Sequence, residues 1–421
     1  MHRGSSLPGK IALKLDKNII SKLKLPENII MVTGSNGKTT TTEMIATIFM
    51  ENGYNVGYNF EGSNLTDGVA TMLLNYSNLK GEVKKDVIII ESDERFAKHT
   101  CKYIKPKYFV VTNIFRDQLT RNGHPQLIYK IIGDAITDDM HLVLNTDDPL
   151  SSLYGKDRQN VTYVGVDKNK YSKKENDSSY NDGVYCPNCQ EKLNYEYYHF
   201  SHIGSYICPK CGHKKQDAEY KVTDLDLETG KITINNESAI TLSMKSYYNV
   251  YNTLLAYAVA AQEGIERENI VKALDNYIIK NDRVQTFEVN GKTKGMLLTS
   301  KHENSISYNQ SIDFIVRENI PCTVIILIDA ISRKYYTSET SWLWDIDFEK
   351  LNAPNIKNII AAGKYAYDIT VRLKYANIDE NKILITTDFD DLDELVNNHS
   401  NEKVYLITCF SDRMKFLNRR K

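Results

Sequence analysis

The stretch IIMVTGSNGKTTTTEMIATIFM, from Ile29 to Met50, constrains the fold of this chain more than any other. It begins with a short apolar run, Ile29 to Val32, which has the length of a buried strand. Gly34 and Gly37 follow, and glycine adopts backbone angles and close approaches that a side chain would block. After Lys38, apolar residues recur at helical spacing. The stretch therefore predicts a strand, a tight loop and a helix.

The loop reads G-x-x-G-K-T, a shortened form of the phosphate-binding loop. In such loops backbone N–H groups and the helix N-terminus cradle phosphate oxygens, the lysine neutralises charge, and the hydroxyl holds Mg²⁺. The alternative is a glycine turn followed by a chance Lys-Thr pair, but the position between a strand and a helix favours nucleotide binding. We expect ATP to contact the loop residues Gly34, Ser35, Asn36, Gly37, Lys38, Thr39 and Thr40.

A second apolar run, Val87 to Ile90, ends at Glu91 in the segment IIIESDERF. A carboxylate at the C-terminal end of a parallel strand, beside the phosphate-binding loop, is the usual second anchor for Mg²⁺. We therefore expect Thr39 and Glu91 to hold Mg²⁺. Asp93 and Glu94 either share this role or are solvated.

Two C-x-x-C pairs make the most specific local pattern in the chain. Their spacing is that of a zinc ribbon, in which four thiolates form a closed tetrahedral site. Four protein ligands leave no open position for catalysis, so we expect a structural Zn²⁺ rather than a catalytic one. The alternative, four free or disulfide-bonded cysteines, fits this spacing less well. The expected ligands are Cys186, Cys189, Cys208 and Cys211.

Length and composition indicate a protein of two or three domains that works in the cytoplasm. The chain has 421 residues and a formal net charge of −1, which gives no indication of a nucleic-acid partner. No apolar run approaches the roughly 20 residues that span a bilayer, and the N-terminus lacks the apolar core of a signal peptide. We expect a cytoplasmic protein, which can still act at the inner face of the membrane on a membrane-held substrate.

The order of apolar runs predicts an α/β fold with two domains. Strand-length runs alternate with helical stretches up to Val166, which predicts a mostly parallel sheet. We expect residues 1–281 to form an ATP-binding domain with the ribbon inserted at 183–215. Further strand-like runs predict a second, Rossmann-like α/β domain over residues 282–421.

Several motifs carry a resemblance to a known family. The form T-G-S-N-G-K-T-T resembles the ATP loop of Mur ligases and folylpolyglutamate synthases. Other segments resemble the MurT family, the Mur ligase-like subunits of lipid II isoglutaminyl synthases, and the ribbon inserted in a Mur-like ATPase is the most specific combination. These segments are RGSSLPGKIALKL, NFEGSN, FRDQL, the cysteine ribbon, YNVYN, SWLWDIDFE and RLKYA.

The resemblance assigns further nucleotide contacts within a Mur ligase-like central domain and C-terminal domain. It implies that Asn64 lies near the γ-phosphate and the substrate carboxylate, that Asn252 reads adenine, and that Arg283 meets the phosphates. Glu91 corresponds to the glutamate that Mur ligases use for magnesium. Helix capping is the alternative for Asn64 and for Asn252, because asparagine is common at helix N-termini, and the neighbouring Asn249 could also serve as that cap.

The resemblance also implies a reaction and a partner. The expected reaction is the ATP-dependent amidation of the α-carboxylate of D-glutamate in lipid II to D-isoglutamine, through an acyl phosphate, with Lys38 and Glu91 as catalytic residues. No glutaminase signature surrounds the remaining cysteines, so ammonia is expected from a GatD-like glutamine amidotransferase subunit in a heterodimer. Asp345 in SWLWDIDFE is the favoured acid to complete the partner's cysteine–histidine pair. Asp347 and Glu339 are its neighbouring alternatives.

Two departures from related sequences bear on the alternative functions. Gln118 replaces a histidine of Mur ligases, which argues against the alternative of a ligase that adds an amino acid. The segment around Lys301 lacks the proline, alanine and glycine of the family's K-N-P-A-G, which motivates a third possibility, a non-catalytic scaffold for the glutaminase.

Overall fold

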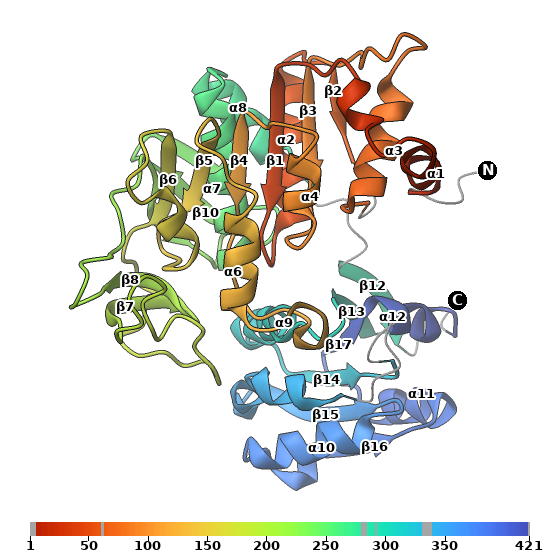
Figure 1. Cartoon of the computed structure of the whole chain (residues 1–421). Coiled ribbons are helices and arrows are strands. Elements are labelled where there is room, and N and C mark those ends of the chain that lie inside the picture. The colour runs from red at the N-terminus through yellow and green to blue at the C-terminus, as the bar shows by residue number, and fades with distance from the viewer. Residues whose placement is uncertain are drawn as a thin grey trace. The chain divides into compact units, whose positions relative to one another are not determined.

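The computed structural model describes residues 6–59, 63–278, 284–289, 291, 293–330 and 339–419 (Figure 1). The chain forms two compact units. Unit 1 consists of Met1–Phe115, His124–Asp177 and Asn181–Ile279, and unit 2 consists of Arg116–Gly123, Ser178–Tyr180 and Lys280–Lys421. Among the described residues, no helix combines the length and the apolar character needed to cross a membrane.

Unit 1 is built on a nine-stranded sheet of order β11-β10-β9-β6-β5-β4-β1-β3-β2. Neighbours in this order from β9 to β2 pair in parallel, and β10 pairs antiparallel with both β9 and β11. The mostly parallel sheet expected from the sequence is confirmed. The strands are β1 (Asn28–Thr33), β2 (Val56–Tyr58), β3 (Val87–Glu91), β4 (Tyr108–Val111), β5 (His141–Asn145), β6 (Val161–Val166), β9 (Tyr220–Asp226), β10 (Lys231–Ile234) and β11 (Ser238–Thr241).

Apolar strands form the core of this unit because both faces of the parallel sheet are covered. The side chains of Ile30, Met31, Ile89 and Phe109 are fully buried. Near the N-terminus, α1 packs on α3, where the Gly9 N–H donates to Thr71 Oγ1 at 2.8 Å. The helices are α1 (Leu7–Leu15), α2 (Lys38–Glu51), α3 (Thr66–Tyr76), α4 (Ala97–Cys101), α6 (Pro125–Gly133), α7 (Tyr247–Gln262) and α8 (Arg267–Asp275), with short 3₁₀ turns η1 (Ile20–Lys22) and η2 (Ser151–Gly155).

The ribbon of unit 1 is an antiparallel hairpin outside the large sheet. Its strands are β7 (Asn194–Phe200) and β8 (Ile203–Ile207), which form a separate two-stranded sheet (Figure 1). One C-x-x-C pair precedes β7 and the other follows β8, so the cysteines meet at the open end of the hairpin, opposite its turn.

Unit 2 contains a six-stranded sheet of order β12-β13-β17-β14-β15-β16. All neighbours pair in parallel except β12 and β13. The C-terminal α/β architecture is therefore confirmed. The strands are β12 (Val284–Val289), β13 (Thr293–Ser300), β14 (Cys322–Leu327), β15 (Ile356–Ala362), β16 (Ile383–Thr386) and β17 (Lys403–Cys409).

Unit 2 also contains helices and 3₁₀ turns, most of which connect its strands. They are α5 (Leu119–Asn122), α9 (Ser305–Glu318), η3 (Ser341–Asp345), η4 (Phe348–Asn352), α10 (Ala366–Tyr375), η5 (Glu380–Lys382), α11 (Phe389–Asn398) and α12 (Phe410–Leu417). Of these, α5 lies in the segment Arg116–Gly123 and α12 follows the last strand. The core includes the fully buried rings of Tyr308, Phe348 and Tyr405.

Candidate active site

The loop between β1 and α2 requires both of its glycines. Gly34 has φ +126° and Gly37 has φ +85°, a region that residues with side chains rarely adopt. A Cβ on Gly34 would lie 2.3 Å from Thr112 Oγ1, and one on Gly37 would lie 2.1 Å from Asn252 Oδ1. The loop is therefore packed against two other segments of unit 1, and its N–H groups stand at the start of α2, where anions bind.

The segment after β4 fixes the shape of the loop. The Asn36 N–H donates to Asn113 Oδ1 at 3.0 Å, and the Ser35 N–H donates to the Asn113 carbonyl at 2.9 Å. Thr112 Oγ1 donates to the Asn36 carbonyl at 2.7 Å. Ser35 Oγ accepts from the Phe115 N–H at 2.9 Å and lies 3.0 Å from the Phe115 carbonyl. No role was expected for Thr112, Asn113 or Phe115, although a Thr-Asn pair at the end of a strand is visible in the sequence.

Lys38 is buried in an ion pair with Glu94. Its Nζ lies 2.9 Å from Glu94 Oε2 and also donates to the carbonyls of Gly34 and Ser35. The expectation that Asp93 and Glu94 could be solvated was wrong, because they are only 4% and 2% exposed. The ammonium is thus held inside the loop, which is where a phosphate-neutralising charge is needed.

Glu91 and Asn64 lie together at the C-terminal end of β3. Asn64 Nδ2 donates to Glu91 Oε1 at 3.0 Å, and Asn59 Oδ1 accepts the Glu91 N–H at 2.7 Å. Val32 of β1 is the register partner of Glu91, so this carboxylate stands beside the strand that enters the loop. Asn64 does not cap α3, whose N-cap is Leu65.

Asn252 of α7 is turned toward the loop. It is buried, and its Oδ1 accepts a hydrogen bond from Thr41 Oγ1 of α2 at 3.3 Å. The capping alternative for Asn252 and Asn249 was wrong, because Ser246 is the N-cap of α7 and its side chain accepts the Asn249 N–H. Arg283 lies outside the described residues.

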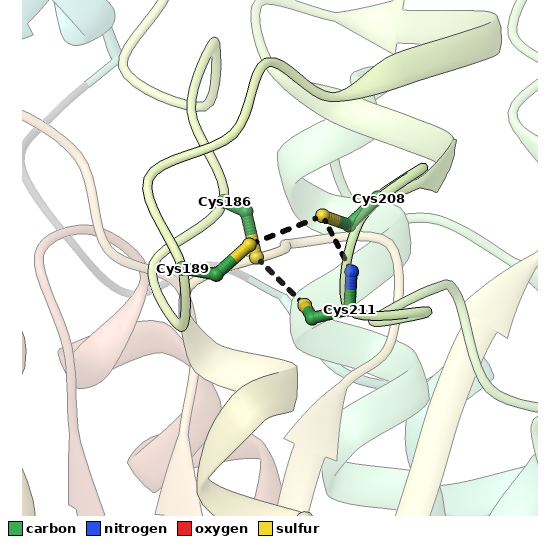
Figure 2. Close-up of side chains that lie close together, drawn as sticks. All are labelled: Cys186, Cys189, Cys208 and Cys211. Carbon is green, nitrogen blue, oxygen red and sulfur yellow. Dashed lines mark hydrogen bonds between the residues drawn. The ribbon is translucent and has the colours of Figure 1, made fainter.

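The four cysteines converge at one point of the ribbon (Figure 2). All four Sγ atoms lie within 4.8 Å of one another. Cys186 and Cys211 are 3.5 Å apart and Cys189 and Cys208 are 3.4 Å apart, with all four sulfurs unbridged. Four sulfur donors at this separation fit the tetrahedral set that Zn²⁺ prefers.

The thiols of this cluster differ in acidity. Burial raises the pKa of Cys186 to about 12. The Asn188 side chain and the His213 backbone lower the pKa of Cys211 to about 6 through hydrogen bonds. A bound cation would favour the thiolate form of every cysteine, the buried one included.

Unit 2 holds the two aspartates of SWLWDIDFE in two different environments. Asp345 is the last residue of η3 and is half-buried, and Arg116 Nη1 lies 2.8 Å from its Oδ1. The Arg116 guanidinium also stacks 4.2 Å from the centre of the Tyr180 ring. Asp347 is buried, accepts hydrogen bonds from the Ser179 N–H and Oγ, and has its pKa raised by burial. Asp345 is therefore the more accessible acid.

Comparison with known proteins defines the class of the fold. The family model for the Mur ligase middle domain matches residues 32–260, and the model for the MurT ligase C-terminal region matches residues 302–412. A pseudomurein peptide ligase type C from Methanothermus fervidus superposes with TM-score 0.71 at 21% identity, covering 96% of this chain and 80% of that one. MurF from Acinetobacter baumannii superposes with TM-score 0.66 at 16% identity, covering 96% and 77%. The chain has the Mur ligase fold.

Curated relatives define the family within this class. The MurT subunit of lipid II isoglutaminyl synthase (glutamine-hydrolyzing) from Streptococcus pneumoniae is 33% identical, over 98% of this chain and 92% of its own length. The corresponding subunit from Staphylococcus aureus strain COL is 31% identical, over 90% of this chain and 84% of its own. The chain belongs to the MurT family.

Proposed function

We propose that this chain is the ATP-dependent subunit that amidates the α-carboxylate of D-glutamate in lipid II to D-isoglutamine. Relatives in its family carry the name lipid II isoglutaminyl synthase. The observation that carries the activity is a buried lysine within a glycine loop, beside the Asn64–Glu91 pair at the end of the neighbouring strand. MurF from Thermotoga maritima, which shares the fold with TM-score 0.60, was solved in complex with ADP.

The chemistry requires activation because a carboxylate is a poor electrophile. A carboxylate oxygen forms a bond to the γ-phosphorus of ATP while the bond to the ADP oxygen breaks. Ammonia then attacks the carbonyl carbon, the carbon–oxygen bond breaks, and phosphate leaves as the nitrogen loses a proton. The loop N–H groups and Lys38 would stabilise the charge that develops on the transferred phosphoryl group. Asn64 would orient Glu91 through its hydrogen bond.

Two cations fit the residues present. Thr39 at the start of α2 and Glu91 at the end of β3 offer the oxygen ligands that Mg²⁺ takes, and the ion would neutralise charge on the phosphates. The four ribbon cysteines would hold Zn²⁺ as a structural ion that closes the open end of the hairpin.

Ammonia in this proposal comes from a glutaminase partner that docks on unit 2. An exposed apolar surface follows one side of α10 and reaches Trp344, next to Asp345. The Trp344 and Tyr375 rings lie 5.2 Å apart and are 48% and 70% exposed, and Tyr367 is 66% exposed. Exposed aromatic clusters of this kind are typical of protein interfaces. Asp345, beside this surface, would orient the catalytic histidine of a GatD-like partner.

Two further assignments belong to this proposal. Asn252 would read the adenine and Arg283 would meet the phosphates, as the family resemblance implies. The functional boundary would fall near residue 281, between an ATP-binding domain and a C-terminal domain.

Transfer of oxygen from the acceptor to phosphate tests the acyl phosphate. Lipid II carrying a heavy-oxygen-labelled α-carboxylate would be incubated with ATP, ammonium and the chain, and the released phosphate would be analysed by mass spectrometry. We expect one labelled oxygen in each phosphate, and none with Lys38→Ala. Amidated product with unlabelled phosphate would contradict the acyl phosphate route.

A further inference from the structure

The turn of the cysteine ribbon lies beside the phosphate-binding loop of unit 1. Ser201 and His202 form this turn between β7 and β8, and both are buried. The His202 ring lies 4.3 Å from the Phe115 ring, measured between centroids. The backbone of Phe115 in turn contacts Ser35 Oγ. A single aromatic residue therefore connects the ribbon with the loop.

A second connection runs through Asp148, which follows β5. His202 Nε2 lies 3.5 Å from Asp148 Oδ1, and Asp148 Oδ2 accepts the Ile114 N–H at 2.9 Å. Ile114 stands between Asn113, whose backbone and side chain hold the loop, and Phe115, whose backbone does so. The same ribbon residue thus contacts two points of the segment that shapes the phosphate site.

Phe200, the last residue of β7, connects the ribbon with α7, the helix that carries the proposed adenine-binding residue. Phe200 is stacked with Phe115 at 6.1 Å, and its ring lies 4.4 Å from the Tyr248 ring and 5.7 Å from the Tyr247 ring. Both tyrosines lie at the start of α7, the helix that carries Asn252. The turn end of the hairpin is therefore packed between the segment after β4, which holds the phosphate-binding loop, and the start of α7.

His202 contacts Phe115 through its ring, and its 3.5 Å approach to Asp148 does not have hydrogen-bond geometry. Neither of its ring nitrogens has a hydrogen-bond partner among the described residues, although the side chain is fully buried. A buried polar group without such a partner costs stability, so stability alone does not account for a histidine here.

We propose that the cysteine ribbon supports the phosphate-binding loop and keeps it in its ATP-binding shape, with His202 as the positioning residue. Zinc at the open end of the hairpin would hold the two strands together. The turn at the other end would then be held against Phe115 and Asp148. The inference rests on the nucleotide site proposed above. The ribbon would then contribute to ATP affinity as well as to the fold.

The affinity of the full-length, zinc-loaded chain for ADP, measured by calorimetry, tests this role. His202→Ala should raise the dissociation constant at least about fivefold, the lower end of typical coupling between sites, while zinc content stays at the wild-type value. His202→Phe keeps a ring against Phe115 and should restore most of the affinity. With ATP as substrate, His202→Ala should raise KM more than it lowers kcat.

Tyr198→Ala is the matched control, because its ring stacks on Tyr195 within the ribbon at 4.2 Å. It should leave ADP affinity unchanged. Wild-type affinity in His202→Ala, or equal loss in Tyr198→Ala, would overturn the positioning role. If the unaltered chain does not bind ADP, the proposed nucleotide site itself fails.

Hydrogen exchange gives a second test that needs no substitution. Removing zinc from the unaltered chain with a chelator should speed amide exchange in residues 34–41 and 112–115 as well as in the ribbon. Faster exchange confined to residues 183–215 would overturn the proposal that the ribbon supports the phosphate-binding loop.

Discussion

Gly37 and Gly53 flank opposite ends of α2 and offer a matched pair of substitutions. Their φ angles are nearly the same, +85° and +86°. A Cβ on Gly37 would lie 2.1 Å from Asn252 Oδ1, whereas one on Gly53 would meet nothing within 4 Å. Comparing Gly37→Ala with Gly53→Ala therefore separates backbone strain from the contact with Asn252.

The expected magnitudes follow from this geometry. Each substitution places alanine in the left-handed region, which costs roughly 1–2 kcal/mol. Gly37→Ala also displaces the buried Asn252 amide and breaks its hydrogen bond with Thr41. Leaving such groups unsatisfied costs about 1–3 kcal/mol, so Gly37→Ala should lower the free energy of unfolding by about 1–3 kcal/mol more than Gly53→Ala.

Urea unfolding and ADP calorimetry measure the two consequences. Gly37→Ala should weaken ADP binding, and Gly53→Ala should not. In an Asn252→Ala background the difference in stability between the two substitutions should shrink, because the overlapping side chain is gone. Equal loss of stability in the wild-type background, or unchanged ADP affinity in Gly37→Ala, would refute the packing of Asn252 against a nucleotide loop.

Three further predictions test separate parts of the molecule. Cys208→Ser should lower zinc content and thermal stability together, whereas Cys101→Ser should keep its zinc; full zinc occupancy in Cys208→Ser would contradict the ligand set. Asp345→Asn should strongly reduce glutamine-driven amidation but spare activity with free ammonium, and equal loss of both would remove this residue from the glutaminase. Burial lowers the pKa of His199 from 6.5, so the unfolded state binds more protons and stability should fall as pH drops below about 6.5, by at most about 1.4 kcal/mol per pH unit. His199→Gln should remove that dependence from urea-unfolding curves, and an unchanged pH slope would show that this histidine is not responsible.

Features encoded in local patterns could be predicted from the sequence. The glycines of the loop occupy left-handed backbone angles, and their spacing in the sequence predicted such a loop. The two C-x-x-C pairs meet as expected. Asn64 was expected near the γ-phosphate and Glu91 was expected to hold Mg²⁺, and the two side chains are hydrogen-bonded to each other. Each of these inferences depends on residues near the end of a strand or in one short motif.

Features that arise from tertiary packing could not be predicted in the same way. Glu94 looks like any charged residue after a strand, and only the fold shows that it is buried against Lys38. His202 lies in an ordinary Tyr-rich hairpin, and its contact with Phe115 joins segments far apart in sequence. If SWLWDIDFE were a strand, Asp345 and Asp347 would share a face, but η3 ends at Asp345 and separates the two acids.

Glutamine-dependent amidation tests the central claim most directly. The chain, a GatD-like partner, ATP and lipid II would be incubated with glutamine carrying heavy nitrogen in its side-chain amide, and the acceptor would be analysed by mass spectrometry. Amidation replaces a hydroxyl group by an amino group, so ordinary glutamine in a parallel reaction lowers the acceptor mass by about one unit. Labelled glutamine gives a product about one unit heavier than that one, and one ADP is formed for each product. We expect this product with the unaltered chain and neither product nor ADP with Lys38→Ala. An acceptor heavier by a whole amino-acid residue would identify a ligase instead, and no ATP-dependent change in the acceptor would leave the chain as a scaffold.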